Sequence, residues 1–403
     1  MSDLNLYAAS KQWATRPADE RFWTPEEARD ACRAYAELAR EAELDLSRER
    51  LVAVGDDVAV TLDGGRGDEL ARFTHWSFGQ LAKFANAPAD YLRKLSPALA
   101  SECVREGLAA YFDGNAAQVR QALVHPAGTP VLRSLTSQRY TRFWNWKVFD
   151  RLADLQGQGW RVPPARPARD GDPRTRPATR ADVLRAKSSG GGLSVKAGDL
   201  IAPAGIYASD HDMFAFMVNE DARIDDGSDG GLSRGFFVSN SEVGAAALRV
   251  TLFHYRHVCS NHIVWGAEDV IDVSVRHVGD VEGRFTLELA GALESYLGQS
   301  AKDEQARVKR ARKTILGKTD EDVLDAVFKA FTKTRKYNLP SGLSVKVLSQ
   351  AIEAAKANED TDGNPYSVWG VVNGLTRVSQ ITAYTDERTF LDRAASAILQ
   401  LAV

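Results

Sequence analysis

The sequence predicts an α+β fold, with a β-rich central sheet, antiparallel or mixed, N-terminal helices and a helical C-terminal region. In residues 193–283, β-branched and aromatic runs alternate with Gly, Asp, Asn and Ser, a pattern typical of strands and turns. Beyond residue 283, apolar residues recur at three- and four-residue spacing, which indicates helices. No fixed-period repeat is visible, so solenoids and propellers are disfavoured.

Length and composition limit the classes of protein that fit. At about 150 residues per domain, 403 residues predict two or three units. With 44% apolar and 26% charged residues, the chain is neither collagen-like, wholly disordered nor stapled by disulfides. A net charge of −3 excludes a protein that coats DNA by bulk positive charge, so any basic site must be local.

Shifts in composition divide the chain into four segments. They are an N-terminal α+β part ending in a basic and aromatic stretch (1–155), a linker or loop rich in Pro, Arg and Gly (156–192), a β-rich core (193–283) and a helical C-terminal region (284–403). In the linker, residues 161–187 hold five prolines and eight Lys or Arg against three Asp, and SSGGG follows at 188–192. This composition predicts a loop.

The expected elements follow in chain order. An amphipathic helix is predicted within 19–49, with Thr24 as N-cap and Pro25 in the first helical position. A hairpin and a third strand come next, then helices around 78–84 and 88–112, and a strand or turn leading into a helix from about Asn145. The C-terminal helices are expected near 288–314, 320–333, 344–358 and 387–401.

The helices after residue 283 carry apolar positions that fit either a subunit interface or an internal core. They are Leu289, Leu293, Leu297, Leu324, Val327 and Phe331. We expect a homo-oligomer on this ground, with an internal core as the equal alternative. The three cysteines are odd in number and widely spaced, and no signal peptide or membrane span is visible, so a cytoplasmic location is expected.

Motifs for nucleotide chemistry are missing from the sequence. Gly317, Lys318 and Thr319 resemble the end of a phosphate-binding loop, but Arg312 stands where that loop needs its first glycine. We interpret Gly317 as the glycine that ends a helix, and expect no cofactor.

Two groups of residues raise the possibility of a metal or a catalytic site. In HYRHVCSNH, His254, His257 and His262 are suitable zinc ligands, although strand alternation places His257 and Cys259 on one face and the other two on the opposite face. A buried strand end is the alternative. Asp210, His211 and Asp212 follow directly on a strand, where catalytic or metal-binding groups can be held rigidly. A solvated turn is the alternative there.

Basic and aromatic residues are interleaved from residue 133 onward. Single-stranded nucleic acid binds to this combination, because guanidinium groups contact phosphates and flat rings stack on unpaired bases. The predicted contacts are Arg133, Arg139, Tyr140, Arg142, Trp146, Lys147, Arg161 and Arg166. The alternative is that the rings belong to the core and the arginines are solvated.

Six stretches resemble the phage- and plasmid-like proteins of the "domain of unknown function 932" family. They are RSLTSQRY (133–140), RPATRADV (176–183), IAPAGIYASDHDMFAFM (201–217), SRGFFVSNSEVGAAAL (233–248), FHYRHVCSNHIVWG (253–266) and SVWGVVNGLTRVSQITAYTDERTFLDRAA (367–395). The resemblance implies a mobile genetic element as the setting, where recombination, single-strand protection and evasion of host defence are common functions.

Together these observations favour a sequence-independent protein that binds or anneals single-stranded DNA, with RNA left open, as a ring or filament and without a nucleotide cofactor. A metal-dependent enzyme acting on nucleic acid or nucleotides would explain the His- and Asp-rich centre instead. A protein that blocks a host defence factor is the third hypothesis.

Overall fold

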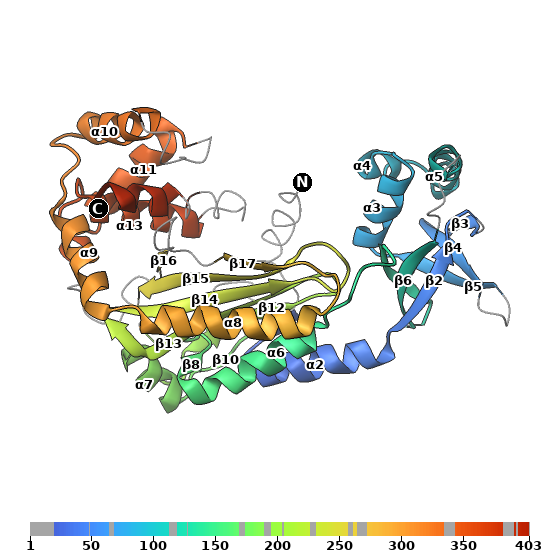
Figure 1. Ribbon diagram of the computed structural model, residues 1–403, viewed down its shortest axis with the longest axis horizontal. Coiled ribbons are helices and arrows are strands. Elements are labelled where there is room, and N and C mark those ends of the chain that lie inside the picture. Colours follow the sequence, from blue (N-terminus) through green and yellow to red (C-terminus); the bar gives the residue numbers. More distant parts are fainter. Residues whose placement is uncertain are drawn as a thin grey trace.

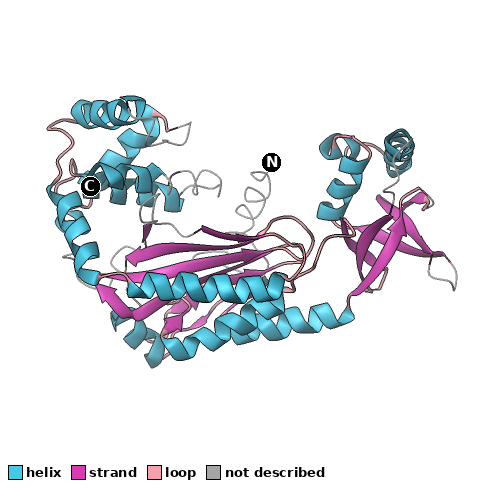
Figure 2. Ribbon diagram, viewed as in Figure 1, coloured by secondary structure: helices cyan, strands magenta, loops and turns pink. Residues whose placement is uncertain are grey.

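A computed structural model of the chain describes residues 20–47, 49–63, 68–112, 119–126, 128–168, 174–188, 195–203, 205–225, 231–256, 261–263, 272–333, 343–381, 391 and 394–402. Helices and several sheets are mixed along the chain, and the C-terminal region is helical (Figures 1 and 2). The predicted α+β class is therefore confirmed.

The centre of the molecule is an antiparallel sheet of eight strands among the described residues. The strands run in the order β1, β12, β13, β14, β15 and β16, and β8 pairs with β13 while β17 pairs with β15. Their bounds are β1 Arg21–Phe22, β8 Trp160–Arg161, β12 Ile206–Ala208, β13 Met213–Ile224, β14 Leu232–Asn240, β15 Leu248–Arg256, β16 Asn261–Ile263 and β17 Asp272–Val275. Sequence patterning thus predicted the β-rich core correctly, and of the two expected sheet types, antiparallel or mixed, the described strands form the antiparallel one.

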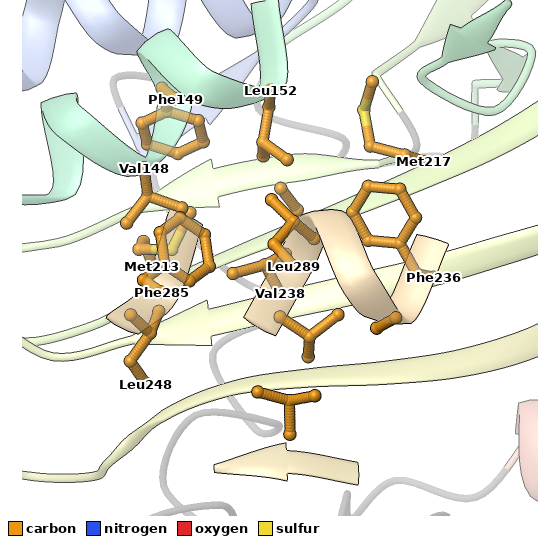
Figure 3. Packing of buried hydrophobic residues seen from close by; sticks show 14 of the residues in the cluster. Val148, Phe149, Leu152, Met213, Met217, Phe236, Val238, Leu248, Phe285 and Leu289 are labelled. Carbon is orange, nitrogen blue, oxygen red and sulfur yellow. The ribbon is translucent and has the colours of Figure 1, made fainter. Parts of the chain in front are cut away.

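Among the described elements, three helices cover one face of this sheet: α2 (Pro25–Leu38), α6 (Asn145–Asp154) and α8 (Val281–Gly298) (Figure 1). Side chains alternate along each strand, so Met213, Met217 and Phe236 all lie on the helix-covered side. Figure 3 shows them against Phe149 of α6 and Phe285 of α8. Each such fully buried side chain contributes about 1.5–3 kcal/mol. This layer is the largest cluster of buried apolar side chains in the described part of the chain.

The predicted N-terminal helix is shorter than expected. Thr24 caps α2 by accepting a hydrogen bond from the Glu27 amide, as the sequence predicts, but the helix ends at Leu38. Residues Arg40–Asp45 form strand β2, which pairs along its whole length with β6 (Val119–His125). The helical spacing of residues 40–49 is overridden because a long neighbouring strand satisfies the backbone of this segment.

In the described residues, the rest of the N-terminal part is a six-stranded sheet with three helices. The strand order is β2, β6, β7, β5, β4 and β3, with bounds β3 Leu51–Val54, β4 Asp57–Asp63, β5 Asp68–Phe73 and β7 Val131–Thr136. The helices are α3 His75–Phe84, α4 Ala89–Leu92 and α5 Pro97–Phe112. The single helix expected over 88–112 is therefore two, because Pro97 starts a new helix.

The expected linker contains ordered elements. Strands β9 (Arg166–Pro167), β10 (Arg176–Pro177) and β11 (Leu200–Ala202) form a small sheet, and α7 spans Arg180–Ser188. Residues 169–173 and the glycine run from residue 189 lie outside the described residues.

The C-terminal region is a helical layer around its own core. Its helices are α9 Ala301–Lys313, α10 Asp320–Lys333, α11 Val345–Lys356, α12 Glu359–Asp362, α13 Val368–Ile381 and the short η3 Gln400–Ala402. The helix expected over 288–314 is interrupted, because Gln299 is extended and Ser300 caps α9. Helix α13 was not predicted, and of the expected 387–401 helix the structure describes residue 391 and residues 394–399 as helical.

The apolar positions considered for a subunit interface pack inside the chain. Leu289 and Leu293 are buried against the central sheet, and Leu297 packs against the same cluster. Val327 is buried in the C-terminal core with Leu324 beside it, while the side chain of Phe331 lies outside the described set. The described side chains of this set therefore belong to the internal core, and the homo-oligomer stays a prediction.

Candidate nucleic-acid interface

Three segments meet where the N-terminal sheet joins the central sheet. They are residues 133–142, which include the end of β7, the β12–β13 turn at 209–212 and the loop after β14 at 241–245. We call this region the junction. Several residues predicted to contact nucleic acid or to perform catalysis lie here.

Arg133 lies in the interior of the junction. The residue is 1% exposed, and its guanidinium donates to Glu242 Oε2 at 3.0 Å and, from Nε, to the Asp210 carbonyl at 3.1 Å. The guanidinium also lies 4.5 Å from the centre of the Tyr35 ring. Its charge is thus matched inside the protein, and the structure corrects the expectation that Arg133 meets a phosphate.

Tyr140 and Arg142 are held in the same way. The Tyr140 hydroxyl donates to the Ser241 carbonyl at 2.7 Å, its ring stacks on His277 at 4.9 Å, and burial raises its pKa. Arg142 Nε donates to Glu41 at 2.6 Å, and Nη1 donates to the Glu242 carbonyl. Only 4% of the Arg142 side chain is exposed, so these two residues also serve the fold.

The loop 241–245 fastens the two sheets together. The carboxylate of Glu242 accepts the amide of Asn145 at 2.7 Å, where the start of α6 favours negative charge. The Val243 carbonyl accepts Trp76 Nε1 at 3.1 Å and Gln80 Nε2 at 2.8 Å from α3. Gly244 adopts a φ of 79°, which favours glycine.

Asp210, His211 and Asp212 form a turn fixed by their own side chains. Ser209 Oγ donates to Asp212 Oδ1 at 2.6 Å, and the His211 ring lies 2.8 Å from Asp210 Oδ1. The turn's carbonyls accept Arg133 and Ser241 Oγ, the latter at 2.6 Å from His211 O. Within the described ranges, no group of three or more His, Cys, Asp or Glu could hold a metal ion. The three residues therefore form a turn closed by its own hydrogen bonds, and their catalytic role stays a hypothesis.

The second candidate metal cluster is only partly described. His257 and Cys259 lie outside the described residues. In the β15–β16 pairing, His254 stands opposite Ile263 and His262 opposite Tyr255. His254 and His262 are therefore not cross-strand partners.

The other predicted contacts are spread over the molecule. Arg139 is exposed in the turn after β7, and Arg166 pairs with Ala202 in the small sheet. On α6, Lys147 forms an ion pair with Glu282. The Arg33 guanidinium carbon lies 5.3 Å from the centre of the Trp146 ring. Arg161 is exposed on β8. The described basic side chains of 133–180 thus lie in several different places of the fold.

The face of the central sheet that points away from α2, α6 and α8 carries a set of aromatic side chains. Phe214 and Phe216 alternate with the helix-facing Met213, Ala215 and Met217. Across the strands Phe214 pairs with Tyr207 of β12, and Phe216 pairs with Phe237 of β14. Ring centres are 5.1 Å apart in the first pair and 5.6 Å apart in the second. Tyr207 is buried, whereas the three phenylalanines are half-buried.

Polar residues flank these rings on neighbouring strands. Arg161 of β8 stands opposite Val218 of β13, which puts it on the same face as Phe216. Thr251 and Arg249 of β15 stand opposite Phe237 and Ser239. We call this set, namely Tyr207, Phe214, Phe216, Phe237, Arg161, Arg249 and Thr251, the aromatic face. The alternating run 213–218 signalled it, but the sequence does not show which side the helices cover.

The residues after Gly317 cap the start of helix α10. The Asp322 carboxylate accepts the amides of Lys318 and Thr319 at 3.0 and 3.1 Å, while Thr319 Oγ1 accepts the Asp322 amide at 3.2 Å. A Cβ on Gly317 would lie 2.3 Å from that of Asp322. The preceding helix α9 ends at Lys313, so the interpretation of Gly317 as a helix-ending glycine was wrong.

Comparison with known proteins gives one match. A family model described as "Domain of unknown function (DUF932)" matches residues 192–392. The matched range includes β12–β17 and most of the C-terminal helices, but leaves out the stretches at 133–140 and 176–183. No curated protein and no solved structure matches the chain. No helix in the described ranges is long and apolar enough to cross a membrane.

Proposed function

The chain belongs to the DUF932 family, and we propose that it is a sequence-independent single-stranded nucleic-acid binding or annealing protein that works without a nucleotide cofactor. The aromatic face is the binding surface in this proposal. We take the phage or plasmid setting and the cytoplasmic location as parts of the same proposal.

The observation that carries the proposal is the placement of the aromatic pairs. An antiparallel sheet packed by helices on one side needs apolar residues on that side only. Here Phe214, Phe216 and Phe237 are only half-buried on the other side, although burying them completely would stabilise the fold. Rings on a sheet are suitable platforms for unpaired bases, and each stacked base contributes about 1–3 kcal/mol.

Arginines at both edges of the rings complete the surface. Arg161 lies on β8 and Arg249 on β15, so the two guanidinium groups are separated by the strands that carry the phenylalanines. A strand that lays its bases on the rings brings its phosphates toward these edges. The family model includes all of the aromatic face except Arg161, which supports a function common to the family.

The proposal extends to a homo-oligomer. A single sheet face accommodates only a few nucleotides, whereas annealing requires long stretches of strand to be held together. Light scattering on the free protein and on its complex with a 60-nucleotide strand tests this part. One 44.1 kDa chain per particle in the free sample, together with one chain per strand in the complex, would contradict it.

Fluorescence anisotropy with a labelled 30-nucleotide poly-dT strand tests binding. The Phe216→Leu/Phe237→Leu variant keeps apolar volume but removes the stacking rings, and we expect its affinity to fall about tenfold or more with an unchanged salt dependence. The Arg161→Gln/Arg249→Gln variant should lower the log–log salt slope by about 1.4. Arg105→Gln, an exposed change on α5, is the charge control.

A duplex and an RNA strand of equal length are titrated in parallel. Binding to single strands over duplex supports the proposal. If the wild-type protein binds none of the three at low salt, or if the leucine variant binds as tightly as the Arg105→Gln control, the aromatic face is not a nucleic-acid site. Circular dichroism of each variant verifies that the fold is retained.

A further inference from the structure

Helix α9 has two different faces. Its inner face contributes Val308 and Ala311 to the C-terminal core, and Glu304 to a buried ion pair with Arg234 of β14 at 2.6 Å. Both carboxylates of the helix, Asp303 and Glu304, lie in its first turn, next to the positive end of the helix dipole. The remaining charges of α9 are all positive.

The outer face of α9 is a row of cations. Lys302, Lys309, Arg310 and Lys313 are exposed, and at 100° per residue they fall within an arc of about 100°. At 1.5 Å per residue, the row is roughly 16 Å long. We call these four residues the cationic face.

Helix stability does not account for the cationic face. Lys309 and Lys313 are like charges at i and i+4, which destabilises a helix. The helix dipole favours cations only in the last turn, a range that excludes Lys302 and Lys309. Carboxylates also do not neutralise the row: over the described part of the chain, no ion pair involves any of its four members, whereas Lys329 pairs with Asp325 and Lys356 with Asp320.

We propose that the cationic face of α9 is a second nucleic-acid site, which binds the phosphate backbone by charge alone. The inference rests on the proposed function only in its choice of ligand, because it uses none of the residues of the aromatic face. Helix α9 leads from one end of the central sheet toward the C-terminal helices (Figure 1). In an annealing protein, such a site holds a second strand while the aromatic face holds the first.

A nucleic acid fits this face better than a membrane does. A helix that lies in a membrane interface inserts an apolar side between the lipids. The apolar side of α9 is already used, because Val308 and Ala311 are 1% and 0% exposed. A phosphate chain requires only the exposed cations, and each neutralised phosphate releases condensed counterions.

The test compares two triple variants with equal charge change. Lys309→Gln/Arg310→Gln/Lys313→Gln removes three members of the cationic face and keeps good helix formers. Lys83→Gln/Lys94→Gln/Lys346→Gln removes three exposed lysines from separate places. Lys83 lies on α3, Lys94 lies just after α4, and Lys346 lies on α11. Both are measured by anisotropy with the 30-nucleotide poly-dT strand over a salt series, and by the rate of annealing of two complementary strands.

We expect the cationic-face variant to lower the log–log salt slope by about 2 and to anneal at least tenfold more slowly, while the scattered variant stays close to wild type. Equal behaviour of the two triple variants would overturn the inference. So would loss of binding to phosphatidylserine vesicles together with unchanged strand binding, which would indicate a membrane site.

The Phe216→Leu/Phe237→Leu protein separates this inference from the proposed function. If that variant binds like wild type while the cationic-face variant is impaired, binding at the aromatic face is contradicted and binding at α9 is supported. If only the leucine variant is impaired, binding at α9 is contradicted and binding at the aromatic face is supported.

Discussion

Arg133 in the junction and Arg310 on α9 carry the same guanidinium group in opposite surroundings. Arg133 is 1% exposed, and Glu242 and the Asp210 carbonyl accept its donors. Arg310 is exposed and stands among lysines on a helix whose two carboxylates lie in the first turn. A count of basic residues along the sequence therefore does not locate an interface, because partners that are distant in the sequence decide which arginines remain available.

The largest effect is expected from breaking the buried pair. Arg133→Met leaves the Glu242 carboxylate without its guanidinium partner in the interior, which should lower the free energy of unfolding by about 3–5 kcal/mol. Arg105→Met breaks an exposed pair with Glu102 and should leave the free energy of unfolding nearly unchanged, because solvent screens that pair. Chemical denaturation followed by circular dichroism measures both.

The double variant Arg133→Met/Glu242→Leu sharpens this test. Removing both charges removes the unpaired carboxylate, so we expect it to recover a large part of the lost stability. A loss below about 1 kcal/mol for Arg133→Met alone would show that the Arg133–Glu242 pair does not stabilise the junction.

A pH dependence is the next largest effect. Burial lowers the pKa of His277 to about 4, and its Nδ1 donates to the Thr141 carbonyl at 3.2 Å. The unfolded chain binds this proton near pH 6.5, so stability is fully present above pH 6.5, falls as the pH drops and levels off below about 4. The loss amounts to about 3 kcal/mol. His277→Asn keeps a donor near Nδ1 and should flatten the stability profile between pH 4 and 6.5; an unchanged profile would contradict the assignment.

Gly244→Ala should have a smaller effect. The residue has a φ of 79°, and a Cβ there would lie 3.1 Å from Thr136 Cγ2. Left-handed backbone in a non-glycine residue costs about 1–3 kcal/mol, so the thermal midpoint should fall by several degrees. Gly291→Ala on α8, where a Cβ meets nothing within 4 Å, is the matched control and should not lower it.

On the cationic face the change in stability should be smallest. Lys309→Gln removes an exposed charge, so the unfolding free energy should change by less than about 0.5 kcal/mol. The salt slope of strand binding should fall by about 0.7. A stability loss of 2 kcal/mol would instead show that Lys309 belongs to the fold.

Local patterns predicted much of the fold because the elements concerned carry their own signals. Thr24 and Pro25 start α2, and turn residues between β-branched runs separate the central strands. The strand β2 was missed because its partner β6 lies about 80 residues further along the chain. Helix α13 was missed because Trp369, Val372 and Leu375 are buried in a core that forms only when α11 packs beside it.

The candidate site was less predictable than the fold. The sequence singled out 133–142 by its charge and rings, but burial against loop 241–245 uses Arg133, Tyr140 and Arg142 for the junction. The aromatic face escaped notice because an alternating run such as 213–218 does not reveal which side the helices will cover. Only the three-dimensional arrangement distinguishes a core phenylalanine such as Phe236 from the half-buried Phe237.

Photochemical cross-linking of a poly-dT strand to the wild-type protein, followed by peptide mapping, identifies the residues that contact the bases. The strand is used without a complementary strand and is bound to the protein at low salt. The cross-linked peptides are then identified by mass spectrometry. If the aromatic face binds the bases, cross-links fall in the peptides that contain Phe214, Phe216 and Phe237. Cross-links confined to the region of Tyr140 and Trp146, with none on β13 or β14, would contradict the account.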